Sequence, residues 1–233
     1  MAKNSICVIT PSVRMAGLKL VQKALEQQGW TEFDWIVCSP EDPHTWATWV
    51  PNPKKNIGDY WAIYKAYNAM IKKADCELIV SWQDYTYARP DTLERLWSHY
   101  QSNPKGIIGV VGNKYENDEW LVKTWQDPRE VGNGISQCPY IEVEWNLCSV
   151  PKQAIVDVGG FDEELDKYSS LCGAGEAFRI NQIGGYQFFL DQSIKTYSTE
   201  HGRLRYWDEY SPFNGIWQRK QEEYKKNPKL NYL

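Results

Sequence analysis

The sequence predicts an α/β fold in which a mostly parallel sheet is flanked by helices and followed by a less regular second half. Two observations and one general rule lead to this prediction. Short apolar runs, typical of buried strands, alternate with helically spaced apolar residues across residues 5–112. Gly and Pro punctuate the boundaries between these segments. Strands and helices that alternate in this way are joined by right-handed crossovers between parallel strands.

The first half supplies the repeating pattern. Apolar runs predict buried strands at residues 5–10, 34–38, 77–82 and 106–112. Between the first two, Leu18, Val21 and Leu25 fall at i, i+3 and i+7, and Gly29 ends the helix that they predict. Further helices are expected at residues 59–73 and 90–101. The polar, Pro-containing stretch at residues 39–55 is expected to be a loop.

The second half is less regular. Residues 115–140 are polar and aromatic, and we expect a lid or acceptor loop there. A strand is predicted at 141–150, a short helix at 152–158, a turn at 159–163, a helix at 174–183 and a strand at 186–190. The tail at 206–233, rich in aromatic residues and Lys, is expected to form a helix that folds over the site. Without internal repeats or a low-complexity linker, residues 1–233 are expected to form a single domain.

Composition excludes several classes of protein. The net charge of −4 argues against nucleic-acid binding, which depends on clustered Lys and Arg. No stretch approaches the roughly 20 apolar residues of a membrane span, and the N-terminus lacks the apolar region of a signal peptide. The six Cys show no CxxC spacing, so we expect buried free thiols, Cys7, Cys38 and Cys76 among them, in a reducing compartment. These features predict a cytoplasmic protein.

The predicted sheet places a ligand site at its carboxyl edge. In open α/β sheets, ligands bind where parallel strands end, which here selects residues 11–14, 39–42 and 83–85. No GxGxxG, phosphate-binding P-loop or GxSxG motif is present, so dinucleotide, phosphate-loop and serine-hydrolase functions lack support. The 12 Trp and 15 Tyr are typical either of a carbohydrate site or of an aromatic core.

Three segments resemble the family-2 glycosyltransferases, which have the GT-A fold. Asn56-Ile57-Gly58, Ala62, Asn68 and Glu77 to Tyr85 are similar to the family pattern N-x-G…A…N…G-E-x-I…D-x-D. Gly159-Gly160-Phe161-Asp162-Glu163 is similar to GGFDE, and Gly175-Glu176 followed by Gly184-Gly185-Tyr186 resembles G-E-D…G-Y. Ile9-Thr10-Pro11 is similar to the end of the family's first strand. The resemblance covers residues 5–192 in the family's order.

The resemblance implies a GT-A-type, Rossmann-like sheet that binds a nucleotide-diphosphate sugar, with Mn²⁺ or Mg²⁺ neutralising the leaving diphosphate. Residues 1–114 would form the nucleotide-sugar-binding half, and residues 115–233 the acceptor and catalytic half with the C-terminal tail. Glu176 is the implied general base of an inverting transfer, and Asp84 and His201 are the candidate metal ligands. Expected contacts to the nucleotide sugar are Thr10, Pro11, Arg14, Ser39, Glu41, Asn56, Lys65, Gln83 and Asp84. Expected contacts to the acceptor or sugar are Trp145, Asp162 and Glu163.

This chain departs from the family pattern at its acids. D-x-D becomes Gln83-Asp84-Tyr85, E-D becomes Glu176-Ala177, and acids follow the second strand only at Glu41 and Asp42. One function is therefore a hexosyltransferase acting on a carbohydrate, lipid-linked or protein acceptor. The alternative is a weakly active or inactive protein that binds a nucleotide sugar. A nucleotidyltransferase would carry a Gly-rich loop after the first strand, which Pro11-Ser12-Val13-Arg14 lacks.

Overall fold

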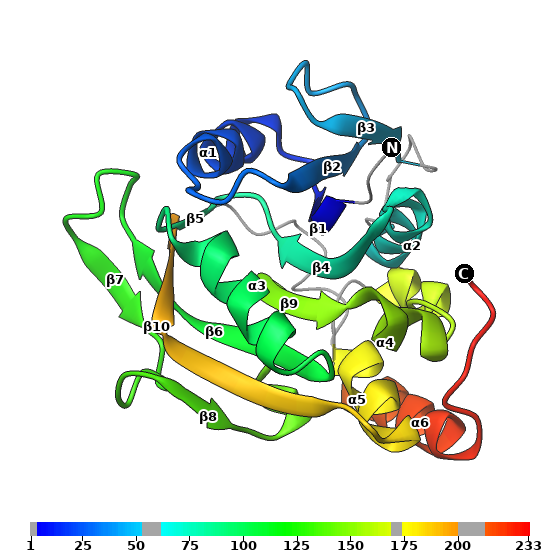
Figure 1. The fold of residues 1–233 in the computed structure, drawn as a ribbon. Coiled ribbons are helices and arrows are strands. Elements are labelled where there is room, and N and C mark those ends of the chain that lie inside the picture. Colours follow the sequence, from blue (N-terminus) through cyan, green and yellow to red (C-terminus); the bar gives the residue numbers. More distant parts are fainter. Residues whose placement is uncertain (1–3, 53–61, 169–173, 200–212) are drawn as a thin grey trace.

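The computed structural model describes residues 4–52, 62–168, 174–199 and 213–233 (Figure 1). Asn56 and His201, two of the predicted site residues, lie outside these ranges. The described strands form one ten-stranded sheet, with helices on both of its faces. Strands from both predicted halves of the chain belong to this sheet.

The strands of the main path follow the order β3-β2-β1-β4-β9-β6-β10-β5. Their bounds are Asn4–Pro11 (β1), Phe33–Ser39 (β2), Thr48–Pro51 (β3), Cys76–Trp82 (β4), Thr86–Ala88 (β5), Gly106–Tyr115 (β6), Leu147–Pro151 (β9) and Gln187–Thr199 (β10). Two shorter strands, β7 (Lys123–Gln126) and β8 (Ile135–Gln137), pair with β6 and β10 at the periphery.

The sheet is more mixed than the sequence predicts. β2, β1 and β4 run parallel, as expected, and so do β6 and β10. β3 extends the first group in parallel, although residues 39–55 were expected to be a loop. Between these groups lies β9, which is antiparallel to both β4 and β6. Because β9 comes after β6 in the sequence, the local periodicity of its residues does not predict its position between β4 and β6. The predicted α/β fold is confirmed, and β9 separates the third and fourth predicted strands, β4 and β6, which run in the same direction.

Two apolar layers, one on each face of the sheet, form the core. Successive β1 residues alternate between them, because neighbouring side chains of a strand point to opposite faces: Ile6 and Val8 join one layer, Cys7 and Ile9 the other. Helices α1 (Met15–Glu26) and α3 (Thr92–Ser102) cover the first layer. Helices α2 (Ile63–Lys73), α4 (Lys152–Asp157) and α5 (Ala174–Ile183) cover the second. Cys7, Cys38 and Cys76 are buried, as predicted.

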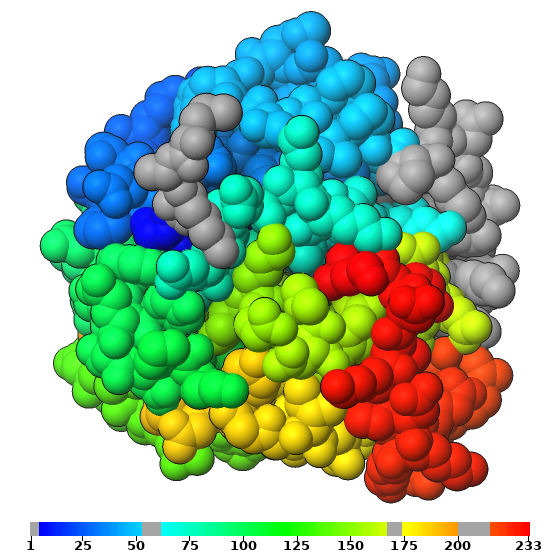
Figure 2. All heavy atoms as spheres, turned by 45° about the vertical axis from the view of Figure 1, so that its right-hand side comes forward, coloured from blue at the N-terminus to red at the C-terminus, as the bar shows by residue number. Residues whose placement is uncertain are grey.

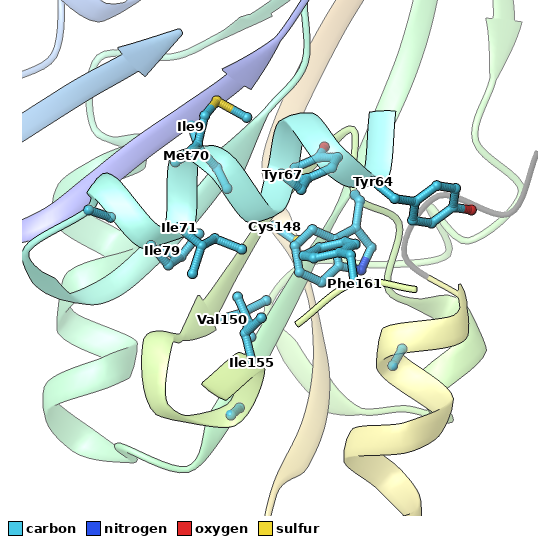
Figure 3. Close-up of a cluster of buried hydrophobic side chains, with 14 of the residues drawn as sticks. Ile9, Tyr64, Tyr67, Met70, Ile71, Ile79, Cys148, Val150, Ile155 and Phe161 are labelled. Atoms are coloured by element: carbon cyan, nitrogen blue, oxygen red, sulfur yellow. The ribbon is translucent and has the colours of Figure 1, made fainter. Parts of the chain in front are cut away.

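Helix α2 joins the second layer through its aromatic and aliphatic side chains (Figure 3). Met70 and Ile71 lie over the β1 and β4 residues Ile9 and Ile79, and the ring of Tyr67 stacks on Phe161 with centroids 4.7 Å apart. The Tyr67 hydroxyl lies 2.9 Å from Ser81 Oγ. This packing connects the end of β4 with the 159–163 turn, although 80 residues separate these segments in the chain.

The C-terminal segment docks on the turn at residues 159–163. Helix α6 (Phe213–Lys226) packs against α5, and the tail beyond it lies across the 150–168 segment (Figure 2). The amides of Leu230 and Tyr232 donate to the carbonyls of Val158 and Gly159, both at 2.9 Å. Gly159 has φ +72°, and a Cβ built on it would lie 1.8 Å from Leu230 O. Only glycine fits beneath the tail there. Of the predicted tail at 206–233, the structure has a helix at Phe213–Lys226, and residues 206–212 lie outside the described ranges.

The segment expected to be a long loop, residues 115–140, contains β7 and β8, and the short 3₁₀ helix η1 (Tyr140–Glu142) begins at its last residue. A second 3₁₀ helix, η2, spans Glu163–Tyr168. Every residue of β7 and β8 is exposed, so neither strand has the apolar alternation that would have predicted it. In the described part of the chain, no helix combines the length and apolar character needed to cross a membrane.

Candidate active site

The parallel strands bring several predicted residues to one edge of the sheet. Arg14 follows the end of β1, Ser39 ends β2, and Gln83 and Asp84 follow β4. Because β1, β2 and β4 are neighbours and run in the same direction, their carboxyl ends meet. The structure therefore assembles Arg14 and Asp84, as the strand-end rule predicts.

Arg14 and Asp84 form a two-point ion pair at this edge. Arg14 Nη2 lies 2.7 Å from Asp84 Oδ1, and Arg14 Nε lies 3.1 Å from Asp84 Oδ2. Ser12 Oγ donates a third hydrogen bond to Oδ2 at 2.7 Å. Side-on pairing of a guanidinium with a carboxylate is geometrically specific as well as strong. The Asp84 side chain is 2% exposed and that of Arg14 is 22% exposed, so Arg14 is the member that meets solvent.

The turn that carries Asp84 is fixed from several sides. The Gln83 amide donates to Asn146 O at 2.8 Å. Tyr85 adopts φ +59°, and its ring lies 5.1 Å below the Arg14 guanidinium. A Cβ added at Gly17, in the first turn of α1, would lie 2.5 Å from the Tyr85 ring and 2.9 Å from Asp84 Cβ. Sequence reasoning missed Ser12 and Tyr85 as contributors, although both lie within the strand-end segments that it selected.

Asp84 does not have the surroundings expected of a metal ligand. Both of its carboxylate oxygens accept hydrogen bonds from Arg14, and one also accepts from Ser12. A guanidinium thus lies where a divalent cation was expected. The other predicted ligand, His201, lies outside the described residues. Within the ranges that the structure describes, no three side chains among His, Cys, Asp and Glu are grouped to hold a metal ion.

The other predicted nucleotide contacts are divided between the core and the surface. Thr10 is fully buried and its Oγ1 accepts from Trp35 Nε1 at 3.0 Å. Ser39 is also fully buried and donates to the Glu41 carbonyl at 2.6 Å, while the Glu41 side chain is exposed. Pro11 ends β1 opposite Cys38. Thr10 and Ser39 therefore support the strand ends from within the core.

Lys65 and Glu163, predicted to contact different substrates, lie together at the start of α2. Their charged atoms are 3.9 Å apart, and Glu163 Oε1 accepts from Asn68 Nδ2 at 3.0 Å. Asp166 accepts the amides of Tyr64 and Lys65 at 2.8 and 3.2 Å and so caps the first turn of α2. Burial raises the pKa of Asp166 to about 7, against the opposing effect of these two amides.

Asp162, predicted to contact the acceptor or sugar, is held by the C-terminal segment. Its carboxylate lies 2.9 Å from Lys220 Nζ and accepts the hydroxyls of Tyr224 at 2.7 Å and Tyr232 at 3.3 Å. Burial alone would raise the pKa of Asp162, but the hydrogen bonds from Lys220 and Tyr224 hold it below its ordinary value. A cavity of about 250 Å³ adjoins this cluster; it is lined by Asp162, Glu164, Lys220, Glu223, Tyr224, Asn227, Leu230 and Tyr232.

Glu176, the predicted base, is inside the protein. It is fully buried beside Arg179, whose Nη2 lies 3.2 Å from Glu176 Oε1. The Asp162 amide donates to the same oxygen at 3.3 Å, and Arg179 donates to the carbonyls of Val158 and Gly160. Burial raises the pKa of Glu176, and the neighbouring Arg179 opposes that shift. In this arrangement the two side chains hold the 159–163 turn in place.

Trp145, the third predicted acceptor contact, belongs to the core. It is 3% exposed, and its indole meets the rings of Phe161 and Tyr67 edge-on, with centroids 4.8 and 5.6 Å away. Its carbonyl accepts from Ser81 Oγ at 2.5 Å. The aromatic content was interpreted as either a carbohydrate site or an aromatic core, and Trp145 belongs to an aromatic core.

Comparison by sequence finds no match among known family models. A search of curated proteins likewise finds none. The fold, in contrast, matches solved structures. Residues 1–349 of TarS from S. aureus, in complex with UDP-GlcNAc, align with a TM-score of 0.69 at 11% identity, over 97% of this chain and 68% of that one.

A second solved structure gives a fold match of the same quality. GalNAc-T7, with UDP, GalNAc and Mn²⁺, aligns with a TM-score of 0.69 at 9% identity, over 96% of this chain and 50% of that one. The chain thus spans about two thirds of the TarS fragment and half of GalNAc-T7. At such identities the likeness concerns the fold, and the fold of this chain is the GT-A glycosyltransferase fold that its sequence resembles.

Proposed function

We propose that the chain transfers a hexose from a nucleotide-diphosphate sugar to an acceptor hydroxyl, with the donor bound at the carboxyl edge of β1, β2 and β4. The observation that carries this proposal is the Arg14–Asp84 pair at that edge. It presents a fixed guanidinium at the position where open α/β sheets bind ligands. The GT-A fold supports the same assignment, since the TarS and GalNAc-T7 structures compared above hold UDP-GlcNAc and UDP, respectively.

The chemistry requires stabilisation of a leaving diphosphate. The bond between the anomeric carbon and the diphosphate oxygen breaks, the acceptor oxygen bonds to that carbon, and the acceptor hydroxyl passes its proton to a general base. Negative charge therefore grows on the diphosphate as the bond breaks. A cation that is already in position when the donor binds stabilises that charge without further reorganisation. Arg14 is such a cation, because Asp84 holds its guanidinium by two hydrogen bonds, and Ser12 holds the Asp84 carboxylate by a third.

The proposal includes inversion at the anomeric carbon, which the family resemblance implies. Inversion needs a base for the acceptor proton. Glu176 fills that role only if an acceptor reaches a side chain that is fully buried and paired with Arg179. We therefore assign Glu176 to positioning of the 159–163 turn. Stereochemistry is measured directly from the anomeric coupling constant of the purified product by proton NMR.

The first experiment follows release of nucleotide diphosphate from UDP-, GDP- and TDP-sugars, with carbohydrate, lipid-linked and peptide acceptors present. The wild-type chain is compared with Arg14→Met and with the control Arg89→Met. Arg89 is 62% exposed and forms only a 3.8 Å pair with Asp91. Acceptor-dependent release that Arg14→Met lowers at least tenfold, and that Arg89→Met leaves unchanged, is the expected result.

The alternative is a protein that binds a nucleotide sugar without turnover. The altered acids, Gln83-Asp84-Tyr85 and Glu176-Ala177, favour it. It predicts binding of a donor by calorimetry and no release with any acceptor. Failure of every donor to bind contradicts both functions. The cytoplasmic location stays a prediction.

A further inference from the structure

We propose that Arg14 takes the place of a divalent cation at the donor diphosphate, so that nucleotide binding by this chain does not depend on metal. This inference rests on the proposed function, because it concerns the same site. It differs from what the family resemblance implies, namely Mn²⁺ or Mg²⁺ held at Asp84. Three features of the described residues carry it.

The first feature is the shortage of carboxylates. Hard divalent cations bind carboxylate oxygens in preference to amides and phenols. Where the family pattern has two acids, this chain has Gln83 and Tyr85, so Asp84 is the single carboxylate of the turn. Both oxygens of that carboxylate already accept hydrogen bonds, three in all, from Arg14 and Ser12.

The second feature is the confinement of Asp84. The residue is 4% exposed and lies against the first turn of α1, where a Cβ at Gly17 would come within 2.9 Å of Asp84 Cβ. The Ser12 hydroxyl holds Oδ2 from the β1 side. Turning this carboxylate toward solvent would break all three of its hydrogen bonds, and it would leave the Arg14 guanidinium unpaired. The geometry identifies Asp84 as the residue that positions Arg14.

The third feature is the orientation of Arg14. Its Nε and Nη2 face Asp84 and its guanidinium lies over the Tyr85 ring, while Nη1 has no hydrogen-bond partner among the described residues. A planar guanidinium matches the geometry of phosphate oxygens. Helix α1 begins directly after Arg14 with no acidic residue in its first turn, so the positive end of its dipole lies beside the same site. Together they provide fixed positive charge for a diphosphate.

The test measures nucleotide affinity rather than turnover. Binding of UDP, GDP and TDP to the full chain is followed by isothermal titration calorimetry in EDTA and then in Mn²⁺. We expect the nucleotide that binds to show affinities within threefold in the two conditions. We also expect Mn²⁺ alone to leave the EPR signal of the free ion unchanged when the chain is added. A tenfold or greater loss of affinity in EDTA that Mn²⁺ restores would overturn the inference and leave the proposed function intact.

Variants separate the two roles of Asp84. If it positions Arg14, Asp84→Asn weakens nucleotide binding by the same factor in EDTA and in Mn²⁺; if it binds metal, the loss appears only in Mn²⁺. Arg14→Met is expected to lower affinity at least tenfold in EDTA, and Arg14→Lys to retain part of it.

Because Arg14→Met leaves a buried carboxylate, the pair Arg14→Met with Asp84→Asn is measured as well, each after a thermal melt that confirms folding. Arg89→Met is the matched control. Failure of all three nucleotides to bind, in either condition, would overturn the proposed function itself.

Discussion

Replacing Asp162 by Asn tests whether this residue holds the C-terminal segment or contacts an acceptor. Asp162 and Lys220 form an ion pair of 2.9 Å in which the two side chains are only 2% and 4% exposed. The carboxylate also accepts the hydroxyls of Tyr224 and Tyr232. Asparagine has nearly the same shape but no charge, and its amide group would meet one of these donors.

The expected loss follows from what Lys220 retains. Removing one partner of a buried ion pair costs about 3–5 kcal/mol. Lys220 keeps Glu164 at 2.6 Å and Glu223 at 3.1 Å, but these side chains are 61% and 50% exposed. Solvent screens these two ion pairs, so they replace only part of the lost interaction with Asp162. We therefore expect a loss of about 2–3 kcal/mol. For a chain of this size, that corresponds to a fall in Tm of about 4–12 °C.

The assay is thermal and urea unfolding of the full chain, with Glu164→Gln as control. That control removes an exposed partner of the same Lys220 and should cost less than about 1 kcal/mol. The charge of Asp162 also sets a pH dependence. Because the folded state lowers its pKa, its contribution is complete above the ordinary carboxyl pKa of about 3.9 and is lost as the pH falls below it. An unchanged Tm together with lost acceptor binding would refute this reasoning and restore the acceptor role.

Three further substitutions probe the same region. Gly159→Ala should cost more than about 3 kcal/mol in urea unfolding, because its Cβ would lie 1.8 Å from a tail carbonyl at φ +72°; the control Gly184→Ala, at φ +71° in open space, should cost only about 1–2 kcal/mol. Asp166→Asn should flatten the stability profile between about pH 4 and pH 7. In that range the raised pKa makes the wild type lose stability as the pH rises, so equal slopes for both proteins would contradict it. Glu176→Gln should cost about 3–5 kcal/mol by leaving the buried Arg179 without a charged partner, whereas lost turnover at an unchanged Tm would identify Glu176 as the base.

Local patterns predicted most of the elements, because burial of a strand or of one helix face leaves a periodic signal in the residues themselves. β1, β2, β4 and β6 lie where their apolar runs predicted them. β7 and β8 were missed because edge strands with fully exposed side chains carry no such signal. β10 extends to Thr199, well beyond its apolar start, because it pairs with β6 along nearly its whole length.

The position of β9 illustrates what local patterns omit. A strand was predicted over residues 141–150, but β9 spans only Leu147–Pro151, and Tyr140–Glu142 is a 3₁₀ helix. The place of β9 between β4 and β6 follows from long-range pairing, such as Leu78 opposite Pro151. Nothing in the composition of a five-residue strand specifies its neighbours. The antiparallel position of β9 between β4 and β6 could therefore be learned only from the structure.

The sequence predicted the part of the site that lies at strand ends and missed the part that depends on contacts between distant segments. Arg14 and Asp84 meet because each follows a strand of the same parallel group, which the sequence indicates. Asp162 and Lys220 meet because α6 returns across the 159–163 turn, a contact that no spacing of residues reveals. The sequence showed that both acids of the family pattern are replaced, but it did not show that Arg14 pairs with Asp84, which stands between them.

The missing acids and the presence of Arg14 are best understood as one change. Two carboxylates with a divalent cation carry no net charge, and neither does Asp84 with Arg14. A diphosphate would therefore meet a site of the same net charge in either arrangement, so the loss of two acids need not weaken donor binding. One difference remains: a metal ion can leave together with the product, whereas Arg14 is tethered to the chain. Inhibition by the product nucleotide should therefore be equally strong with and without chelator, and a chelator-sensitive inhibition constant would contradict this equivalence.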